Sequence, residues 1–204
     1  MLENVENSMF FCNIIIVSKK GVVSMEEKLD VLNKRGEFTG NVATREECHR
    51  EGLWHRAVYG FIIDKNSNVL LQKRSKYKKL WPNKWDVTVG GHVDAGEFGG
   101  QTIIRECKEE LGIDVRENEI KYLISSTSVY EKNNYSSKHY DECYLILKDV
   151  DVTKLKLQKN EMSDVQYFSK DELLKRIENN FDGLTEKTGS WHFLKKILED
   201  DRIG

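Results

Sequence analysis

The sequence predicts a mixed α/β or α+β domain, and three observations lead to this prediction. Strand-like segments come first, a single glycine-introduced helix follows over residues 98–111, and further strands and two helices complete the chain. A chain of 204 residues is long enough for one domain with elaborations, since a domain takes about 100 to 200 residues. This order of elements predicts helices packed against a sheet.

The N-terminal quarter divides into two predicted parts. Residues 1–24 are expected to form a tail and residues 25–53 an extension packed on the core. The apolar stretch 9–17 is too short to span a bilayer and follows acidic residues, unlike a signal peptide, so it predicts a surface strand or a disordered tail. Residues 19–22 are what a ribosome-binding sequence would encode before Met25, which raises the hypothesis that residues 1–24 are not native.

The extension itself carries turn and capping signals. Short apolar alternation over residues 27–40, broken at Arg35 and Gly36, predicts a small hairpin. A short helix over residues 43–52 is expected to begin at Thr44, because Glu47 stands at capping-box spacing.

Residues 54–204 are predicted to form the main domain. Its expected elements are strands at 54–63, 68–73, 85–89, 121–129, 142–148 and 165–169 and helices at 98–111, 170–180 and 189–200. The polar, tyrosine-bearing segment 130–140 is either a substrate loop or an ordinary long hairpin connection. The last helix, with Trp191 and Phe193, could serve either a core or a dimer contact.

The helix at 98–111 carries three clustered carboxylates. At about 100° per residue, Glu106, Glu109 and Glu110 fall within one arc. A different, apolar face of the helix carries Ile104, Cys107 and Leu111. Like charges at these spacings cost about 0.2 to 0.5 kcal/mol per pair, and carboxylate oxygens suit Mg²⁺ or Mn²⁺ shared with substrate phosphates. The helix therefore predicts a divalent-metal site, the alternative being a solvated acidic face.

The residues around the helix favour the metal site. Gly90 and Gly91 allow close backbone approach before it, and Gly112 follows it as a C-terminal stop. Glu97 stands eight residues before Arg105.

Together, Gly91, Glu97 and the run from Arg105 to Ile113 resemble the complete signature of the Nudix hydrolase superfamily. The resemblance implies an α/β/α sandwich with a mixed sheet, here with an N-terminal hairpin extension and C-terminal helices. It also implies Mg²⁺-dependent hydrolysis of a diphosphate linkage, in a nucleoside diphosphate derivative or a related organic diphosphate, with Mn²⁺ as a substitute metal.

The resemblance also assigns roles within the signature. Glu106, Glu109, Glu110 and the carbonyl of Gly91 would be the metal ligands. Arg105 would pair with Glu97 and fix the turn against the helix. Glu106 or another nearby carboxylate would take the proton of the attacking water.

Residues outside the signature are candidates for substrate contacts. Lys73 and Arg74 end a strand and could clamp a phosphate, although a solvated strand end would look the same. Glu161 precedes a strand at a place where the superfamily often has an auxiliary acid. His55 and His92 are further substrate-binding candidates.

The surroundings of the signature resemble one branch of the superfamily, that of isopentenyl-diphosphate isomerase. The shared segments are residues 70–75, 79–85 and 91–92, with His49 and His55 upstream. Those isomerases use a histidine-rich metal site and a cysteine just before the Gly-His pair, where this chain has Gly90, which has no proton to transfer. Hydrolysis is therefore favoured over isomerisation. The intact signature favours hydrolysis over a catalytically silent nucleotide-binding module. A second metal site, phosphate contacts and packed rings all remain open for His49, His55 and His92.

Composition limits the other possibilities. The formal charge is −2 and no basic run stands out, which argues against a nucleic acid polymer as partner. Cys12, Cys48, Cys107 and Cys143 form no Cys-x-x-Cys pair and are predicted to be free thiols in a reducing cytosol. The sequence thus predicts a cytoplasmic enzyme without membrane attachment.

Overall fold

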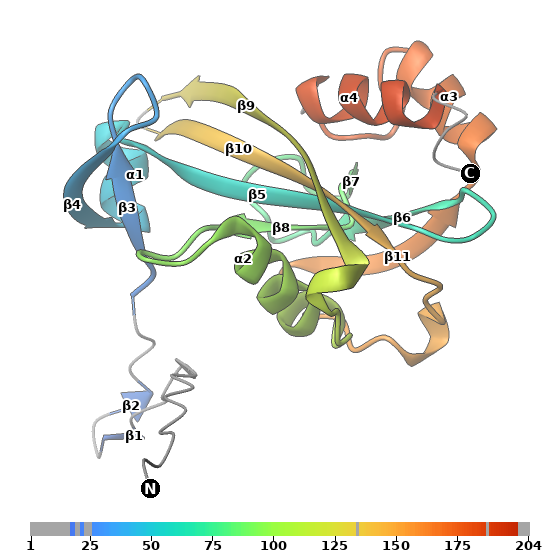
Figure 1. Cartoon of the computed structure of the whole chain (residues 1–204), viewed down its shortest axis with the longest axis horizontal. Coiled ribbons are helices and arrows are strands. Elements are labelled where there is room, and N and C mark those ends of the chain that lie inside the picture. Colours follow the sequence, from blue (N-terminus) through green and yellow to red (C-terminus); the bar gives the residue numbers. More distant parts are fainter. Residues whose placement is uncertain (1–16, 19–20, 23–25, 134, 187, 200–204) are drawn as a thin grey trace, which may run out of the picture.

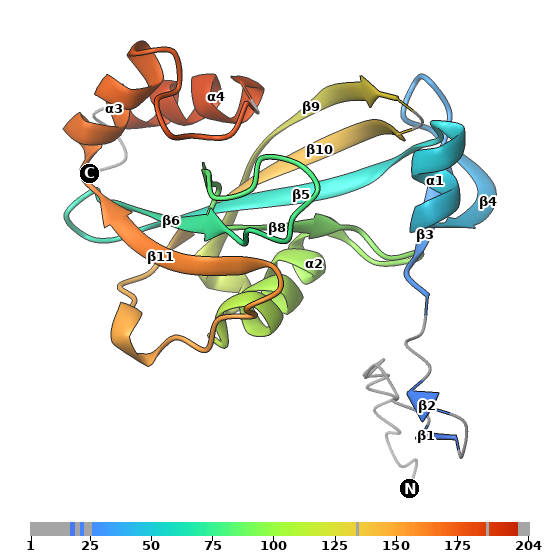
Figure 2. The same ribbon diagram turned by 180° about the vertical axis from the view of Figure 1, so that it is seen from behind.

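A twisted mixed sheet lies between helix α2 on one face and helices α3 and α4 on the other (Figures 1 and 2). The computed structural model describes residues 17–18, 21–22, 26–133, 135–186 and 188–199. The predicted α/β/α sandwich with a mixed sheet is confirmed.

The main path of the sheet runs β11-β6-β5-β10-β9, with β3 and β8 also pairing with β5, β4 with β3 and β7 with β6. Neighbours in this sheet are antiparallel except β5 and β10, which are parallel. The strands are β3 (Lys28–Leu32), β4 (Phe38–Thr44), β5 (Trp54–Ile63), β6 (Val69–Arg74), β7 (Trp85–Asp86), β8 (Val89–His92), β9 (Ile120–Lys132), β10 (Tyr135–Leu147) and β11 (Met162–Phe168). The helices are α1 (Arg45–Glu51), α2 (Gly99–Glu106), α3 (Lys170–Glu178) and α4 (Thr188–Glu199), with a π-helical turn at Cys107–Leu111 and 3₁₀ turns at Glu117–Glu119 and Val152–Lys154.

Strand β5 separates two apolar cores because successive side chains of a strand point to opposite faces. Phe61 packs on one face with the buried Trp191 of α4, and Ile62 packs on the other with Ile103 of α2. Trp191 is 0% exposed, so the last helix serves the core. A homodimer remains a prediction.

The extension is built from β3, β4 and α1. Thr44 and Glu47 form the predicted capping box at the start of α1, and Gly52 ends the helix in the left-handed conformation. Strand β3 reaches β5 through the pair Leu32 and Trp54, which joins the extension to the main sheet.

Two predicted segments are wrong. Residues 130–140 are not a long connection, because β9 continues to Lys132 and β10 begins at Tyr135. The facing ends of the two strands, residues 130–132 and 135–140, are largely polar and therefore carry little hydrophobic pattern. The strand predicted at 85–89 is two short strands with different partners, β7 on β6 and β8 on β5.

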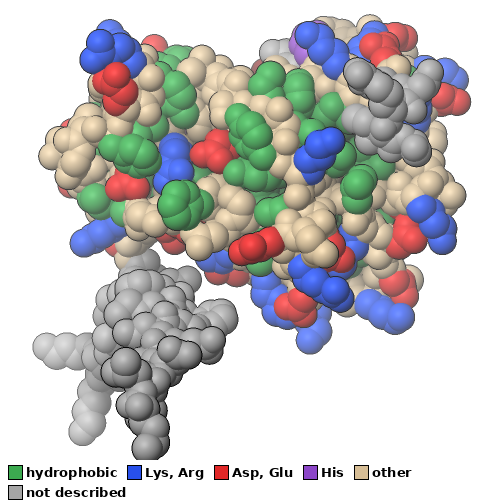
Figure 3. Space-filling model, in the orientation of Figure 1, with side chains coloured by type: hydrophobic (Ala, Val, Ile, Leu, Met, Phe, Trp, Pro, Cys, Tyr) green, Lys and Arg blue, Asp and Glu red, His purple; other side chains and the backbone are tan. Residues whose placement is uncertain are grey.

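Most of the predicted tail, including residues 9–16, lies outside the described residues. The hypothesis that residues 1–24 are not native also concerns this part of the chain. Within it, β1 (Val17–Ser18) pairs with β2 (Gly21–Val22). In the described part of the chain, no helix has the length and apolarity to cross a bilayer. Apolar side chains are spread among charged ones on the face in Figure 3.

Candidate active site

The glycine turn brings the backbone of β8 against the carboxylate helix. Gly91 pairs with Val58 of β5, which holds the turn in the sheet. A Cβ built on Gly91 would overlap Oε1 of Glu106. Only glycine therefore lets this carboxylate reach the strand backbone.

Arg105 connects the turn to the helix, as predicted. Its guanidinium Nη2 lies 3.1 Å from Oε2 of Glu97, and Nη1 lies 2.9 Å from Oε1 of Glu106. Nη2 also donates to the carbonyl of His92 at 3.3 Å. One side chain thus ties together the turn, the strand end and a carboxylate of the site.

The π-helical turn changes the predicted faces of the helix. An α-helical spacing of 100° no longer holds past Cys107, and Glu110 joins the buried side with Leu111 while Glu109 stays 44% exposed. The buried apolar position in the first part of the helix is Ile103 and not the predicted Ile104. π-Helical turns frequently occur at functional sites.

Burial raises the pKa of both inner carboxyls. The pKa of Glu106 rises to about 7, chiefly because of burial, with Arg105 opposing the shift and Glu109 adding to it. The pKa of Glu110 lies well above its ordinary value because of burial and the nearby charges of Glu106 and Glu161. Oε2 of Glu110 is buried and has no hydrogen-bond partner.

These observations fit a hard divalent cation. A buried carboxylate oxygen without a donor is costly, and two such carboxyls together repel when both are ionised. A dication would remove both costs, and oxygen ligands are those that Mg²⁺ and Mn²⁺ prefer. Glu109 lies at the exposed side of the same helix, 3.3 Å from Arg105.

The other predicted residues occupy different environments. Lys73 lies over the ring of Trp85, 5.8 Å from its centroid. Arg74 forms a buried ion pair with Asp86 at 2.9 Å, which gives its guanidinium a structural partner. Glu161 pairs with Lys78 and acts electrostatically on Glu110, so it lies next to the carboxylates.

His55 and His92 face other histidines. His55 is 0% exposed, and the His92 side chain is 11% exposed. Their rings lie 5.2 Å apart, close to those of His49 and His139. Burial lowers the pKa of His55 to about 2 and that of His92 well below its ordinary value.

The sequence did not point to several residues of this region. Lys78 lies in a lysine-rich segment in which nothing singles it out. Glu27, 3.2 Å from Nδ1 of His92, precedes the extension hairpin, and His139 lies in the segment predicted as a connection. Only the sheet topology brings these residues to the site. The three cysteines among the described residues, Cys48, Cys107 and Cys143, are buried free thiols, as predicted.

Comparison with known proteins identifies the family to which this chain belongs. The family model described as NUDIX domain matches residues 53–187. The chain belongs to the Nudix family. A Nudix hydrolase of Listeria monocytogenes is 34% identical over 148 residues, covering 72% of this chain and 82% of that protein. Nudix hydrolase 3 of Arabidopsis thaliana is 35% identical over 147 residues, covering 70% of this chain but only 19% of the plant protein.

The fold and the similarity to the isopentenyl-diphosphate isomerase branch agree with membership of the Nudix family. The crystal structure of DR0079 from Deinococcus radiodurans superposes with a TM-score of 0.60 at 22% identity, covering 84% of this chain and 97% of that one. An isopentenyl-diphosphate isomerase of Escherichia coli is 30% identical over 96 residues, 47% of this chain and 53% of the isomerase. This Nudix protein is a hydrolase acting on phosphorus–oxygen anhydride bonds.

Proposed function

We propose that this Nudix hydrolase is a Mg²⁺-dependent pyrophosphohydrolase that cleaves the diphosphate linkage of a nucleoside diphosphate derivative or a related organic diphosphate. The observation that carries the proposal is the buried pair of Glu106 and Glu110, in which Oε2 of Glu110 lacks any donor. Two buried acids are stable together when a dication shares them.

Glu106, Glu109, Glu110 and the carbonyl of Gly91 are the residues that would hold the ion, and Mn²⁺ would substitute for Mg²⁺. A bound dication would neutralise phosphate oxygens and so ease attack by a nucleophile on an anionic phosphorus. Arg105 keeps the helix carboxylates in place, and Glu97 in turn holds Arg105.

Glu106 is the proposed proton acceptor for the attacking water. Arg105, 2.9 Å from Oε1, orients this carboxylate. Glu97 acts through Arg105 and is therefore a positioning residue.

The organic part of the substrate is proposed to lie along an aromatic row. Trp81 contacts Tyr130 edge to face at 5.5 Å between ring centroids, and Tyr130 contacts Tyr135 at 6.4 Å. Aromatic faces of this kind can stack on a base. Lys73 and Lys78 are the cations proposed to bind the substrate phosphates. Lys78 is a candidate because it pairs with Glu161, which lies next to the carboxylates of the site.

A substrate panel tests the proposal. The purified protein is incubated with Mg²⁺ and nucleoside diphosphate derivatives, and release of phosphate or nucleoside monophosphate is measured beside isomerisation of isopentenyl diphosphate. Hydrolysis without isomerisation is the expected result. Glu109→Gln should lower turnover by orders of magnitude with the fold intact, because a neutral amide is a poor ligand for Mg²⁺, and unchanged turnover would refute the ligand assignment.

Gly90→Cys tests the isomerase alternative in the same assay. This change restores a thiol before the Gly-His pair, and we expect no gain of isomerase activity. We also propose that the protein acts in the cytoplasm on a small molecule and has neither a nucleic acid polymer nor a membrane as partner. This part of the proposal rests on the balanced charge and the buried thiols.

A further inference from the structure

The turn formed by residues 94–97, between β8 and α2, is held by the N-terminal extension. Figures 1 and 2 show this segment running beside β3. The N–H of Ala95 donates to the carbonyl of Lys28 at 2.8 Å. The N–H of Gly96 donates to Oδ2 of Asp30 at 2.9 Å. Two successive peptide groups of the turn that leads into α2 are therefore bound by β3.

Arg56 of β5 holds the next peptide group of the 94–97 turn. Its Nη2 donates to the carbonyl of Glu97. The carboxylates of Asp30 and Glu142 lie farther away, at 3.9 Å from Nη2 and 3.6 Å from Nη1. The arginine side chain is 14% exposed, and a hydrogen bond from a charged donor is stronger than one between neutral groups. Among the described residues, the backbone of Glu97 is thus the closest polar contact of this guanidinium.

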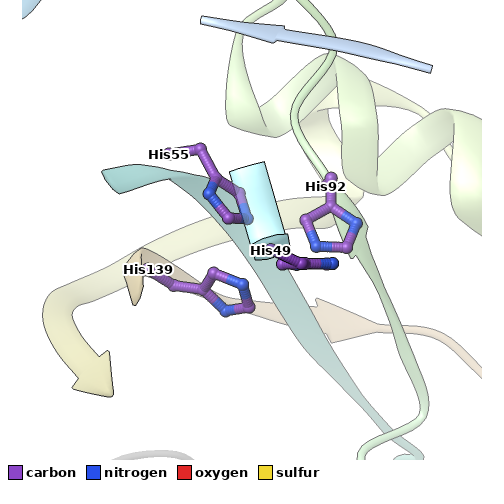
Figure 4. Close-up of side chains that lie close together, drawn as sticks. All are labelled: His49, His55, His92 and His139. Carbon is purple, nitrogen blue, oxygen red and sulfur yellow. The ribbon is translucent and has the colours of Figure 1, made fainter. Parts of the chain in front are cut away.

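The side chain of Arg56 points away from the histidine cluster. The ring of His55, the preceding residue, points toward the three other histidines in Figure 4. Because successive side chains of a strand point to opposite faces, Arg56 lies on the other face of the sheet. Val58 and Ile62 share that side of β5 and belong to the core that contains Ile103 of α2. Arg56 therefore reaches the turn from the α2 face.

Glu142 of β10 holds Arg56 at the start of α2. One of its oxygens, Oε1, faces Arg56, and the other, Oε2, accepts from the hydroxyl of Tyr144 at 2.7 Å. A Cβ built on Gly99, the first residue of α2, would overlap Oε2. Glycine at this position therefore leaves room for the carboxylate beside the helix.

The side chain of Glu97 connects this network to the active site. Its Oε2 accepts from Nη2 of Arg105 at 3.1 Å and from the hydroxyl of Thr102 at 2.8 Å. Nη1 of Arg105 lies 2.9 Å from Oε1 of Glu106. An unbroken series of contacts therefore runs from Arg56 through Glu97 to Glu106.

We propose that Arg56 is a positioning residue for hydrolysis, because it fixes the backbone of Glu97. Glu97 holds Arg105, and Arg105 orients Glu106. The inference rests on the proposed function, in which Glu106 is a metal ligand and the proton acceptor. It also gives the N-terminal extension a part in catalysis, since Asp30 lies beside both the turn and Arg56.

Arg176 of α3 makes the same kinds of contact on the other face of the sheet (Figure 1). Its Nη2 lies 2.9 Å from Oε1 of Glu172, and its Nη1 donates to the carbonyl of Asp182 at 3.2 Å. Each of the two guanidinium groups, of Arg176 and of Arg56, also lies 5.2 Å from the centroid of a phenylalanine ring. Arg176→Met is therefore the matched control. It should lower stability without lowering kcat.

Kinetics on the nucleoside diphosphate derivative found in the substrate panel measure the effect of Arg56→Met, which keeps an apolar stem and removes the guanidinium. We expect kcat to fall by about 10- to 100-fold and KM to change by less than about threefold, since displacement of a catalytic group by about 1 Å can cost 100-fold. Arg56→Lys keeps the charge but not the fork and should lie between the parent and Arg56→Met. Melting curves set an assay temperature at which each variant is folded, and Arg56→Lys replaces Arg56→Met if the latter does not fold.

A double-mutant cycle tests whether Arg56 acts through Glu97. Glu97→Gln weakens the ion pair with Arg105, so Arg56→Met should lower kcat by a smaller factor in that background than in the parent. Residues of one network have non-additive effects, whereas independent sites add. A general loss of folded protein would instead lower kcat by the same factor in both backgrounds.

Mn²⁺ binding to the full-length protein, measured by water-proton relaxation, gives a readout that needs no turnover. Arg56→Met should weaken Mn²⁺ binding by about 10-fold, as loss of outer support does at other metal sites. Arg176→Met should bind Mn²⁺ like the parent.

The two readouts separate this inference from the proposed function. A parent that binds Mn²⁺ but hydrolyses no compound of the panel would contradict the proposed function, and the Mn²⁺ affinity of Arg56→Met would then decide the inference. The inference is overturned if the Arg56 variants keep the kcat and the Mn²⁺ affinity of the parent, if Arg176→Met loses kcat equally, or if the cycle is additive. A parent that neither binds Mn²⁺ nor hydrolyses any compound would overturn both.

Discussion

Gly91 and Glu106 lie so close that a Cβ on residue 91 would occupy the place of Oε1 of Glu106. Gly91→Ala should therefore displace this carboxylate from the site. We expect kcat/KM to fall by about 100-fold, since displacing a catalytic group by about 1 Å can cost that much. Steady-state kinetics on the substrate found in the panel measures the effect.

Gly100→Ala is the matched control. A Cβ there would meet only Cδ1 of Ile120 at 3.4 Å, an ordinary contact. Alanine also favours a helix over glycine by about 0.5 to 1 kcal/mol. The control should keep its activity with equal or higher stability, and equal losses in both variants would contradict the proposed contact of Gly91 and Glu106.

Glu110→Gln should change activity and stability in opposite directions. The carboxylate of Glu110 is buried, with Oε2 unpaired and the acids Glu106 and Glu161 nearby. A neutral amide removes the charge repulsion, so the metal-free protein should gain about 1 to 3 kcal/mol at pH 8. Turnover should fall by orders of magnitude, as the proposed ligand is lost.

Urea unfolding in EDTA measures that gain. Glu109→Gln is the comparison, because its side chain is 44% exposed and water already solvates the charge. It should lose turnover with a stability change within about 0.5 kcal/mol. A loss of stability in Glu110→Gln would show that the backbone hydrogen bond from Gly90 and the charge of Lys78 outweigh burial and repulsion at this carboxylate.

Glu106 should make the metal-free protein less stable as pH rises, relative to a variant that lacks this carboxyl. The pKa of Glu106 is about 7 in the folded protein, against 4.5 as its ordinary value. Between these values the unfolded chain releases the proton while the folded chain keeps it. The contribution of Glu106 to the free energy of unfolding should therefore drop between about pH 4.5 and 7, by on the order of 3 kcal/mol, while the buried histidines with lowered pKa values act in the opposite direction. Glu110, whose pKa is also raised, should extend the fall to higher pH.

Melting curves from pH 5 to 8 in EDTA check this direction. The stability of the parent should fall with pH relative to that of Glu106→Gln, and saturating Mg²⁺ should oppose this fall, since the ion stabilises the ionised carboxylates. The same pH dependence of stability in the metal-free parent and in Glu106→Gln would contradict the raised pKa of Glu106.

Local patterns in the sequence predicted the parts of the site that depend on neighbouring residues. The capping box of Thr44 and the bounds of β5 follow from propensity and spacing, and the pair of Arg105 with Glu97 follows from the family resemblance. The contact of His139 with His55 depends on parallel pairing of strands separated by most of the domain, which no local pattern encodes. The π-helical turn also escapes a regular 100° spacing, so the burial of Glu110 was not predictable.

The ion pair of Arg74 and Asp86 should prove structural. The two side chains are 13% and 1% exposed, and Thr185 also donates to Asp86 at 3.1 Å. Arg74→Ala removes the guanidinium that is paired with the buried carboxylate of Asp86 and should cost about 3 to 5 kcal/mol of stability. Lys108→Ala, which breaks the exposed pair with Asp114, should cost about 1 kcal/mol or less.

The same variants distinguish a structural role of Arg74 from phosphate binding. If Arg74 serves the fold, Arg74→Ala lowers the urea midpoint, and the protein that remains folded keeps its KM for the diphosphate substrate. Lys73→Ala should instead raise KM with little loss of stability, because Lys73 rests on Trp85 without a buried ion pair among the described contacts. A raised KM with unchanged stability in Arg74→Ala would assign the phosphate contact to Arg74 after all.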